Sequence, residues 1–445
     1  MEKRWIILMS LIVVVSLIGV FMPEVPDIWV PDSNFNAANV AWMITATIFV
    51  LMMTPGLSFF YGGMVGQKNV ISTILQSFIA MGIVSVVWVV FGFSLAFGDD
   101  IGGFIGNPAT FFMFNGVGAK VNTTLAPTIP LALYALFQMK FAIITPSLIT
   151  GSFAERVRFS GYMVFMMLFC IFVYCPLAHW TWHPDGFLRQ LGVVDFAGGI
   201  VVHASSGVAA LAGAIFLGRR HDSRLPHQPA NIPFVILGAA MLWLGWFGFN
   251  AGSSLAADGI AVKAFLNTNT ASATAMMVWI FFDCLRGRKP SAMGAAIGAV
   301  VGLVAITPSA GYVTVGESIF IALTTTLVCN IAVYWKNKTS VDDALDVFPT
   351  HGVGGIFGTI LTGVFVNGLV AGHIDVFMIH LLAVVLVCAY TFVVSYALYW
   401  ITNKMIPMRV SAKSEAIGLD ISQHDEHYGF SDVGDRELAE YHEEK

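Results

Sequence analysis

Apolar stretches follow one another along most of this chain, and no other feature restricts its fold as strongly. Each is about 20 residues long, which as a helix crosses the hydrocarbon core of a bilayer, about 30 Å thick. The composition agrees, because 57% of the 445 residues are hydrophobic and 11% are charged, against about 25% charged in soluble domains. The sequence therefore predicts an all-α polytopic membrane protein with eleven transmembrane helices. We place them near 39–62, 70–97, 128–151, 159–180, 197–218, 232–254, 260–282, 291–308, 315–335, 351–370 and 375–402.

The basic residues of the loops gather on one side of these predicted helices. That side holds eleven, namely Lys68, Arg156, Arg158, Arg219, Arg220, Arg224, Arg286, Arg288, Lys289, Lys336 and Lys338. The other side holds Lys120, Arg189 and Lys263. Because basic loops stay in the cytoplasm, the first helix should start outside and the C-terminus should be cytoplasmic. We expect a multi-pass protein of the inner (plasma) membrane, surrounded by membrane lipids. Nothing in the sequence suggests a nucleic-acid partner.

The two ends of the chain differ from the central part, 36–402. An apolar run at 5–22 follows two basic residues and precedes a Pro-rich stretch that looks like an outer linker. The run fits either a signal peptide or an extra N-terminal span, so residues 1–35 stay open between these two alternatives. The sequence becomes polar after the last apolar stretch, and we expect residues 403–445 to form a cytoplasmic C-terminal tail.

Two histidines lie inside the apolar stretches, each eight residues after an aspartate: His203 follows Asp195, and His351 follows Asp343. Eight helical residues rise about 12 Å, so both histidines should lie near the middle of the membrane. Their helices run in opposite directions in the predicted topology, which brings the imidazoles within reach of each other. Ionisable groups in a membrane are costly and indicate a functional site. The plainer alternative, a histidine that only bonds a carbonyl, explains either residue alone better than the matched pair.

These opposed segments indicate an inverted repeat of five helices and five helices, 39–218 and 232–370, followed by a last helix at 375–402. Small residues follow both histidines and would let the helix backbones approach closely. Each aspartate, Asp195 or Asp343, is too far from its own histidine to bond it directly. We expect each to act as a structural acid that caps the start of its helix.

Two facing neutral imidazoles offer one donor and one acceptor nitrogen each, which suits a small ligand that both gives and takes hydrogen bonds. No metal-binding carboxylate or cysteine lies near either histidine in the sequence, and the five cysteines lack metal or disulfide spacing. We therefore expect no metal and no cofactor. The apolar stretches also lack a nucleophile or cofactor loop, so an enzyme is not indicated.

Five separated blocks of sequence resemble one known family. They are TPGLSFFYGGMVGQKNV from Thr54, ALFQMKFAIITPSLITGSFAERVRFS from Ala135, DFAGGIVVHASSGVAALAGAIFLGRR from Asp195, WLGWFGFNAGS from Trp243 and DDALDVFPTHGVGGIFG from Asp342. In these blocks the chain resembles the ammonium transporter family, the Amt/Mep/Rh proteins, and the bacterial Amt branch in particular. The resemblance runs from about residue 36 to the end of the chain, although the segment 183–194 matches only loosely.

The resemblance implies an eleven-helix bundle that assembles as a homotrimer with one pore in each subunit. It also implies roles for matched positions, namely Phe137, Trp182 and Ser253 in an outer vestibule that binds ammonium, Phe141 and Phe249 in a stacked phenyl gate, His203 and His351 in the pore, and Asp195 as a buried acid required for conduction. Lys140 directly precedes Phe141. As a helix neighbour it should point about 100° away from the pore.

The chemistry of these residues suits ammonium. Aromatic faces attract a small cation, and a serine oxygen accepts one of its hydrogen bonds. Inside a narrow apolar pore the charge is costly, so we expect ammonia to pass the histidines, with a proton relayed through them. Methylammonium is the expected analogue. An ammonium sensor with little flux is the alternative, and a carbon dioxide channel is a weaker one. The tail resembles one that helps PII-type signal proteins bind the cytoplasmic face.

Overall fold

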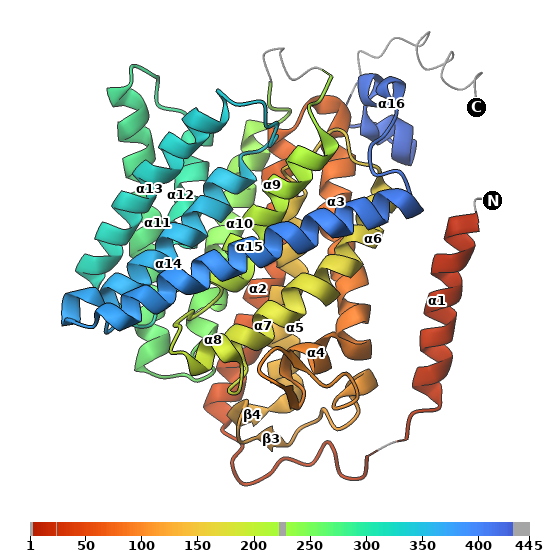
Figure 1. The fold of residues 1–445 in the computed structure, drawn as a ribbon, viewed down its shortest axis with the longest axis vertical. Helices are drawn as coiled ribbons and strands as arrows, with labels where there is room; N and C mark the ends of the chain where they lie inside the picture. Colours follow the sequence, from red (N-terminus) through yellow and green to blue (C-terminus); the bar gives the residue numbers. More distant parts are fainter. Residues whose placement is uncertain (1–2, 24, 222–227, 430–445) are drawn as a thin grey trace.

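The computed structural model describes residues 3–23, 25–221 and 228–429, so Arg224 and the end of the predicted tail lie outside the described residues. The described part is a bundle of long helices (Figure 1). The first five predicted spans correspond to α2 (Ala37–Met64), α3 (Val70–Val87) with α4 (Phe93–Phe97), α5 (Leu131–Ile149), α6 (Phe159–Phe169) with α7 (Cys175–Trp182), and α9 (Ser205–Leu217). The other six correspond to α10 (Ile232–Gly252), α11 (Gly259–Leu285), α12 (Ala292–Ile306), α13 (Val315–Lys336), α14 (Val353–Phe365) and α15 (Ile374–Met405). The predicted all-α membrane fold is confirmed.

Two of these eleven elements differ from the others in length or polarity. By length and hydropathy, nine helical segments of the described residues can cross a membrane, and α12 is apolar but shorter. The longer α11 is less apolar because it carries polar side chains that turn into the bundle. Its Asn267 is fully buried and donates to the carbonyl oxygens of Ala310 and Val313 at 2.9 and 2.7 Å. Polar groups bonded between helices are compatible with a membrane helix.

Side chains at the helix starts explain several boundaries. Four capping residues each accept the backbone N–H three positions further on, and they are Asn36, Asn231, Asp258 and Ser291. At the start of α13, Thr314 and Glu317 bond each other's backbone N–H groups in a capping box. Each such cap satisfies an N–H group that has no partner within the helix and contributes about 1 kcal/mol.

Short strands cover one end of the bundle. β1 (Asp100–Ile101) pairs with β2 (Ile105–Gly106), and β3 (Val121–Asn122) pairs with β4 (Ala126–Pro130), both antiparallel. Because β4 takes up the residues before it, α5 begins at Leu131 and not at the predicted 128. We call this end of the bundle the strand end; β3 and β4 lie at the bottom of Figure 1.

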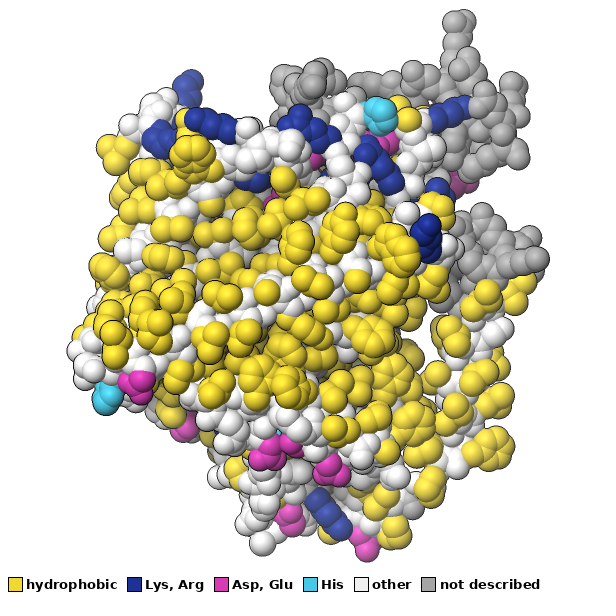
Figure 2. Space-filling model, viewed as in Figure 1, with side chains coloured by type: hydrophobic (Ala, Val, Ile, Leu, Met, Phe, Trp, Pro, Cys, Tyr) yellow, Lys and Arg dark blue, Asp and Glu magenta, His cyan; other side chains and the backbone are white. Residues whose placement is uncertain are grey.

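Charged side chains divide between the two ends. In Figure 2, Lys and Arg gather at the end that carries α16 (Ala412–Ile417), a broad band of hydrophobic side chains follows, and Asp and Glu predominate at the strand end. We call the basic end the α16 end. A hydrophobic band between two polar ends is the surface expected of a protein that spans a bilayer.

The predicted apolar run near the N-terminus forms α1 (Lys3–Val20). In Figure 1 this helix stands beside the bundle, joined to it by an extended connection. Many of its apolar side chains are exposed, including Ile12 and Leu17. A signal peptide and an extra span are both helical, so the two alternatives stay open.

The segments that carry His203 and His351 cross inside the bundle, and the crossing is reciprocal. A Cβ atom on Gly207, four residues after the first histidine, would overlap the backbone of Gly352, which directly follows the second. A Cβ atom on Gly355, four residues after the second histidine, would lie 2.7 Å from the backbone nitrogen of Ala204, which directly follows the first. Segments related by a twofold axis meet through equivalent residues, so this pairing supports the inverted repeat.

Candidate functional site

His203 and His351 lie together at this crossing. Their segments open with π-helical turns, Gly199–Ala204 and Phe348–Gly352. The side chains are 1% and 2% exposed, and their Nδ1 atoms are 3.4 Å apart. Between neutral rings one Nδ1–H donates to the other Nδ1, which leaves one Nε2 acceptor and one Nε2–H donor. The Nε2 of His203 is buried without a hydrogen-bond partner among the described residues.

Asp195 holds the start of the first histidine segment. Its Oδ1 accepts the N–H groups of Gly198 and Gly199, at 2.8 and 2.6 Å. Its Oδ2 accepts those of Ile200 and Val201, at 2.8 and 3.2 Å. Four charge-assisted bonds satisfy N–H groups that a helix start leaves free. The carboxylate therefore orients the backbone that carries the histidine.

Asp343 does the same for the second segment. Its carboxylate accepts the N–H groups of Val347 and Phe348, four and five residues on, at 3.2 and 2.7 Å. Lys336 donates to the carbonyl oxygen of Asp343 at 2.9 Å and pairs with Asp346 at 2.7 Å. Both histidines are thus positioned by an aspartate at the same sequence offset.

Aromatic rings lead from the strand end to the histidines. Phe141 stacks on Phe249, with ring centroids 4.2 Å apart and ring planes at 30°. Trp182 meets Phe141 edge-on at 5.7 Å, and Phe249 lies 5.9 Å from the ring of His203. Both stacked rings are buried. The two predicted gate residues are therefore in contact and lie between Trp182 and the histidine pair.

A cavity of about 360 Å³ opens outside this stack, and Phe141, Trp182 and Ser253 are among its lining residues. The Ser253 hydroxyl donates to the carbonyl oxygen of Phe249 at 2.8 Å, which leaves its oxygen lone pairs available as acceptors. Phe137, the third predicted vestibule residue, is buried and does not belong to the lining. Its ring packs edge-on against Phe141 at 4.9 Å, so it contacts the stacked pair and not the cavity.

Two polar residues outside the predicted site, Gln138 and Thr181, also line this cavity. The Gln138 Oε1 and Thr181 Oγ1 atoms are buried without a hydrogen-bond partner among the described residues. Unpaired buried acceptors are costly unless a ligand or water satisfies them. Each residue is the sequence neighbour of a predicted site residue, Phe137 or Trp182. A polar side chain within or next to an apolar span is the sequence feature that could have identified both residues.

Comparison with known proteins identifies the family. The model of the Ammonium Transporter Family matches residues 41–428. The chain belongs to the ammonium transporter family. Its relatives are named as transporters and not as enzymes. It is 45% identical to the putative ammonium transporter of Methanothermobacter thermautotrophicus, over 88% of this chain and 98% of that one. It is 43% identical to the ammonium transporter of Bacillus subtilis, over 87% of this chain and 97% of the relative.

Solved structures agree with this membership. The crystal structure of Saccharomyces cerevisiae Mep2 matches with a TM-score of 0.82 at 33% identity, over 90% of this chain and 93% of that one. A structure titled Sensor Amt Protein matches with a TM-score of 0.80 at 30% identity, over 87% of this chain and 98% of that one. This ammonium transporter family member therefore has the predicted fold along most of its length.

Lys140 is turned away from the cavity of this family member. Its side chain is partly buried, its Nζ lies 3.7 Å from the Met139 sulfur, and it is not among the lining residues. This direction agrees with the helix geometry expected for a residue beside Phe141. The positive charge of Lys140 therefore does not face the cavity.

Beyond the histidine pair the interior is constricted. A small cavity of about 10 Å³ touches His351 on this side, and its lining includes Tyr61, Leu345 and Thr350. A water needs about 10–15 Å³ measured in the same way. The space beside His351 is thus at the lower limit for one small molecule.

One further group of titratable side chains lies outside this path. Asp100, His179 and His183 bring three potential metal-ligand atoms within 4.8 Å of one another. The sequence predicts no metal, and these three residues are not among the predicted site residues. They come from two separate parts of the chain, so spacing along the sequence does not reveal them.

Proposed function

We propose that this protein binds ammonium in the cavity at the strand end and conducts ammonia through a hydrophobic pore past His203 and His351. The observation that carries the proposal is the buried contact between the two imidazoles, 3.4 Å apart, directly behind a closed aromatic gate. Asp195 and Asp343 serve as structural acids that hold the two halves of this pair. Methylammonium is the expected substrate analogue.

Binding in the cavity relies on groups that replace water around a small cation. The faces of Trp182 and Phe141 attract a cation at about 0.5–2 kcal/mol each. Ser253, Gln138 and Thr181 supply oxygen acceptors for its N–H groups. An ammonium ion has four N–H donors, so it satisfies acceptors that otherwise lack partners.

Passage beyond the gate favours the neutral molecule. A bare ammonium ion in an apolar interior carries a desolvation penalty of at least several kcal/mol. Ammonia is neutral, donates and accepts hydrogen bonds, and matches the Nε2 acceptor and Nε2–H donor of the paired histidines. A proton given up in the cavity can pass through the same pair, because each ring both donates and accepts.

The proposal also covers the assembly of the protein, its orientation in the membrane and its domains. We infer a homotrimer in the cell membrane, since the exposed apolar side chains of the helices can face lipid or a neighbouring subunit. The basic α16 end is then cytoplasmic, by the excess of Lys and Arg in its loops. Residues 1–35 form the N-terminal region, 36–402 the transporter domain and 403–445 the cytoplasmic tail.

The described part of the tail contacts this basic end closely. Asp420 accepts the N–H groups of Ile71 and Ser72 at 3.1 and 2.7 Å, at the start of α3. Arg409 donates to the carbonyl oxygen of Leu217, at the end of α9, at 2.8 Å and pairs with Glu415 of the tail at 2.9 Å. We propose that this ordered surface takes part in binding a PII-type signal protein.

Ammonium sensing with little flux is the alternative function. It is favoured by the likeness to the structure titled Sensor Amt Protein. A sensor needs the cavity and the tail but not an open pore. Flux and binding therefore have to be measured on the same preparation.

The test is the current carried by the reconstituted protein in ammonium gradients at several pH values. We expect a current that follows ammonium and that is lost when His203 and His351 are both replaced by alanine. His373→Ala, at an exposed position, is the matched control and should conduct normally. An unchanged current in the double variant would contradict the relay. Saturable ammonium binding without flux in the unmodified protein would favour sensing.

A further inference from the structure

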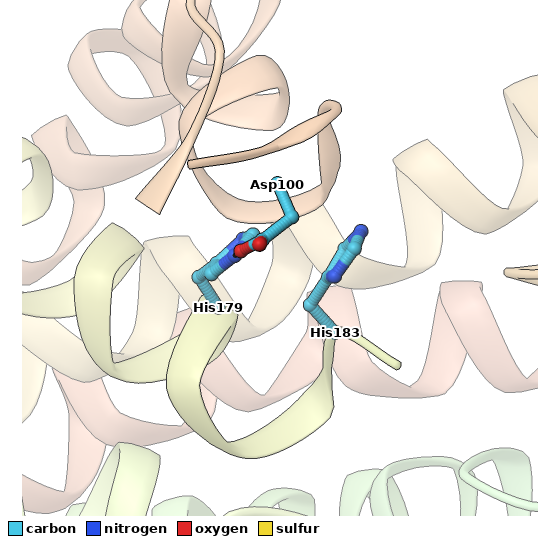
Figure 3. Close-up of side chains that lie close together, drawn as sticks. All are labelled: Asp100, His179 and His183. Atoms are coloured by element: carbon cyan, nitrogen blue, oxygen red, sulfur yellow. Dashed lines mark hydrogen bonds and ion pairs between the residues drawn. The ribbon is translucent and has the colours of Figure 1, made fainter. Parts of the chain in front are cut away.

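Three side chains at the strand end point toward one another. Asp100 belongs to β1, His179 to the last turn of α7, and His183 follows one helical turn later (Figure 3). The side chains of the histidines are 0% and 8% exposed, and that of Asp100 is 24% exposed. The two imidazole rings are stacked, with centroids 4.4 Å apart.

The hydrogen bonds of His179 define which of its nitrogens carries a lone pair. Its Nδ1 lies 3.0 Å from the carbonyl oxygen of Ala96. A carbonyl only accepts, so Nδ1 carries the hydrogen and Nε2 of the neutral ring has a lone pair. That Nε2 faces the Oδ1 of Asp100 at 2.8 Å.

The second histidine also presents an acceptor nitrogen, which is bonded to a backbone N–H. The backbone N–H of Asp185 donates to the Nδ1 of His183 at 3.2 Å, so this nitrogen is also an acceptor. In the neutral His183 ring the Nδ1 lone pair is therefore shared with this N–H, and a metal ion would replace the hydrogen bond. Between the Asp100 carboxylate and the Nε2 of a neutral His179, two acceptor atoms 2.8 Å apart face each other with no hydrogen between them. Two acceptor atoms this close repel unless a cation or an additional proton lies between them.

We propose that Asp100, His179 and His183 bind a divalent transition-metal ion of the zinc type. Two histidines four residues apart present their rings on one side of a helix, and with a carboxylate they form a common zinc ligand set. The bond from His179 Nδ1 to the Ala96 carbonyl is the outer bond that normally orients a metal-bound imidazole. This site is separate from the proposed ammonium path and does not depend on it.

The distances require a small rearrangement. Zinc bonds of about 2.0–2.2 Å with tetrahedral angles separate two ligand atoms by about 3.3–3.6 Å. The Asp100 oxygen therefore has to move about half an ångström away from His179, and its short two-residue strand and partial exposure allow this. A fourth position is open to water or to Asp185, whose carboxylate lies 3.9 Å from the Nδ1 of His183.

Metal binding would fasten the β1–β2 hairpin to the end of α7. His183 lies between Trp182 and Pro184, and both neighbours line the cavity. An ion at this position therefore limits movement of the cavity wall that carries the Trp182 ring. We expect zinc to raise the thermal stability of the protein and to change the apparent affinity for methylammonium.

The test uses the full-length protein carrying an affinity tag without histidine. After treatment with a chelator, the protein is dialysed against Zn²⁺, and bound metal and thermal unfolding are measured. We expect one Zn²⁺ per chain and a raised Tm. His183→Ala and Asp100→Asn should each weaken binding at least tenfold. His373→Ala, an exposed histidine outside the cluster, is the control and should bind as before.

Two results would overturn the metal site. The first is equal binding by all four proteins, which would indicate adventitious surface zinc. The second is no binding by the unmodified protein, in which case His179 and Asp100 form an imidazolium–carboxylate pair. Because metal content and Tm are measured without transport, failure of this test leaves the proposed ammonium conduction untouched. Loss of ammonium current would likewise not affect the zinc measurement.

Discussion

Replacing Gly355 by alanine tests whether the close helix crossing sets the geometry of the histidine pair. The new Cβ would lie 2.6 Å from the carbonyl oxygen of Gly199, 2.7 Å from the nitrogen of Ala204 and 2.9 Å from the Cβ of His203. Ordinary contact begins at 3.4 Å, so α14 must move away by about 0.8 Å. Two of the three atoms belong to the backbone and cannot rotate aside.

The expected loss follows from this displacement. Overpacking of a close contact costs about 1–3 kcal/mol, and backbone overlap puts this site at the upper end. A shift of this size takes the Nδ1 atoms of His203 and His351 from 3.4 Å to about 4 Å, beyond hydrogen-bond reach. We expect a Tm lower by several degrees in detergent and methylammonium uptake reduced at least tenfold in proteoliposomes.

The control is Gly82→Ala, in the middle of α3. This glycine is exposed and a Cβ on it would meet nothing within 4 Å. Alanine favours a helix over glycine by up to about 1 kcal/mol, so this variant should match or exceed the original Tm and transport normally. If Gly355→Ala behaves like Gly82→Ala in both assays, the argument from close packing is wrong.

Two more variants test charged groups at the helix starts. Asp195→Asn replaces one accepting oxygen by an NH₂ group that faces backbone N–H donors, so thermal unfolding should show a loss of about 2–4 kcal/mol; an unchanged Tm would contradict the capping role. At Asp342, burial raises the pKa of the carboxyl, but hydrogen bonds from Arg220 and the charges of Arg156 and Arg220 outweigh it and hold the pKa at about 2. The resulting stabilisation, about 2 kcal/mol after allowance for solvent screening, is present above the unfolded pKa of about 3.9 and lost toward pH 2. The difference in free energy of unfolding between the original protein and Asp342→Asn should therefore decrease as pH falls from 4 to 2. A difference that stays constant over this range would show that it does not come from the lowered pKa of Asp342.

The helices and the histidine pair were predictable because both depend on patterns within the chain. Apolar length predicts a span whatever surrounds it. The equal spacing from Asp195 to His203 and from Asp343 to His351, together with opposed directions, predicted their meeting. The boundary of α5 was less predictable, because pairing between β3 and β4 decides where this helix starts.

Other features depend on contacts that no local pattern contains. Phe137 carries a family motif, yet the packing of neighbouring helices directs its ring behind Phe141 and away from the cavity lining. Asp100 and His179 are 79 positions apart and meet only because the β1 turn folds over the end of α7. No local pattern in the sequence therefore predicts a metal-binding group where these three ligand atoms converge.

The sequence by itself determined that this chain spans a membrane many times, in which regions, and with two matched histidines. Hydropathy and charge act locally, so they can be read residue by residue. Only the tertiary structure decided how closely the two halves cross, which side chains line the cavity, and that a second polar cluster forms beside it. All three features depend on steric contact between segments that are distant in the sequence. At Gly207 and Gly355, for example, a single added methyl group would overlap the backbone of the opposite segment.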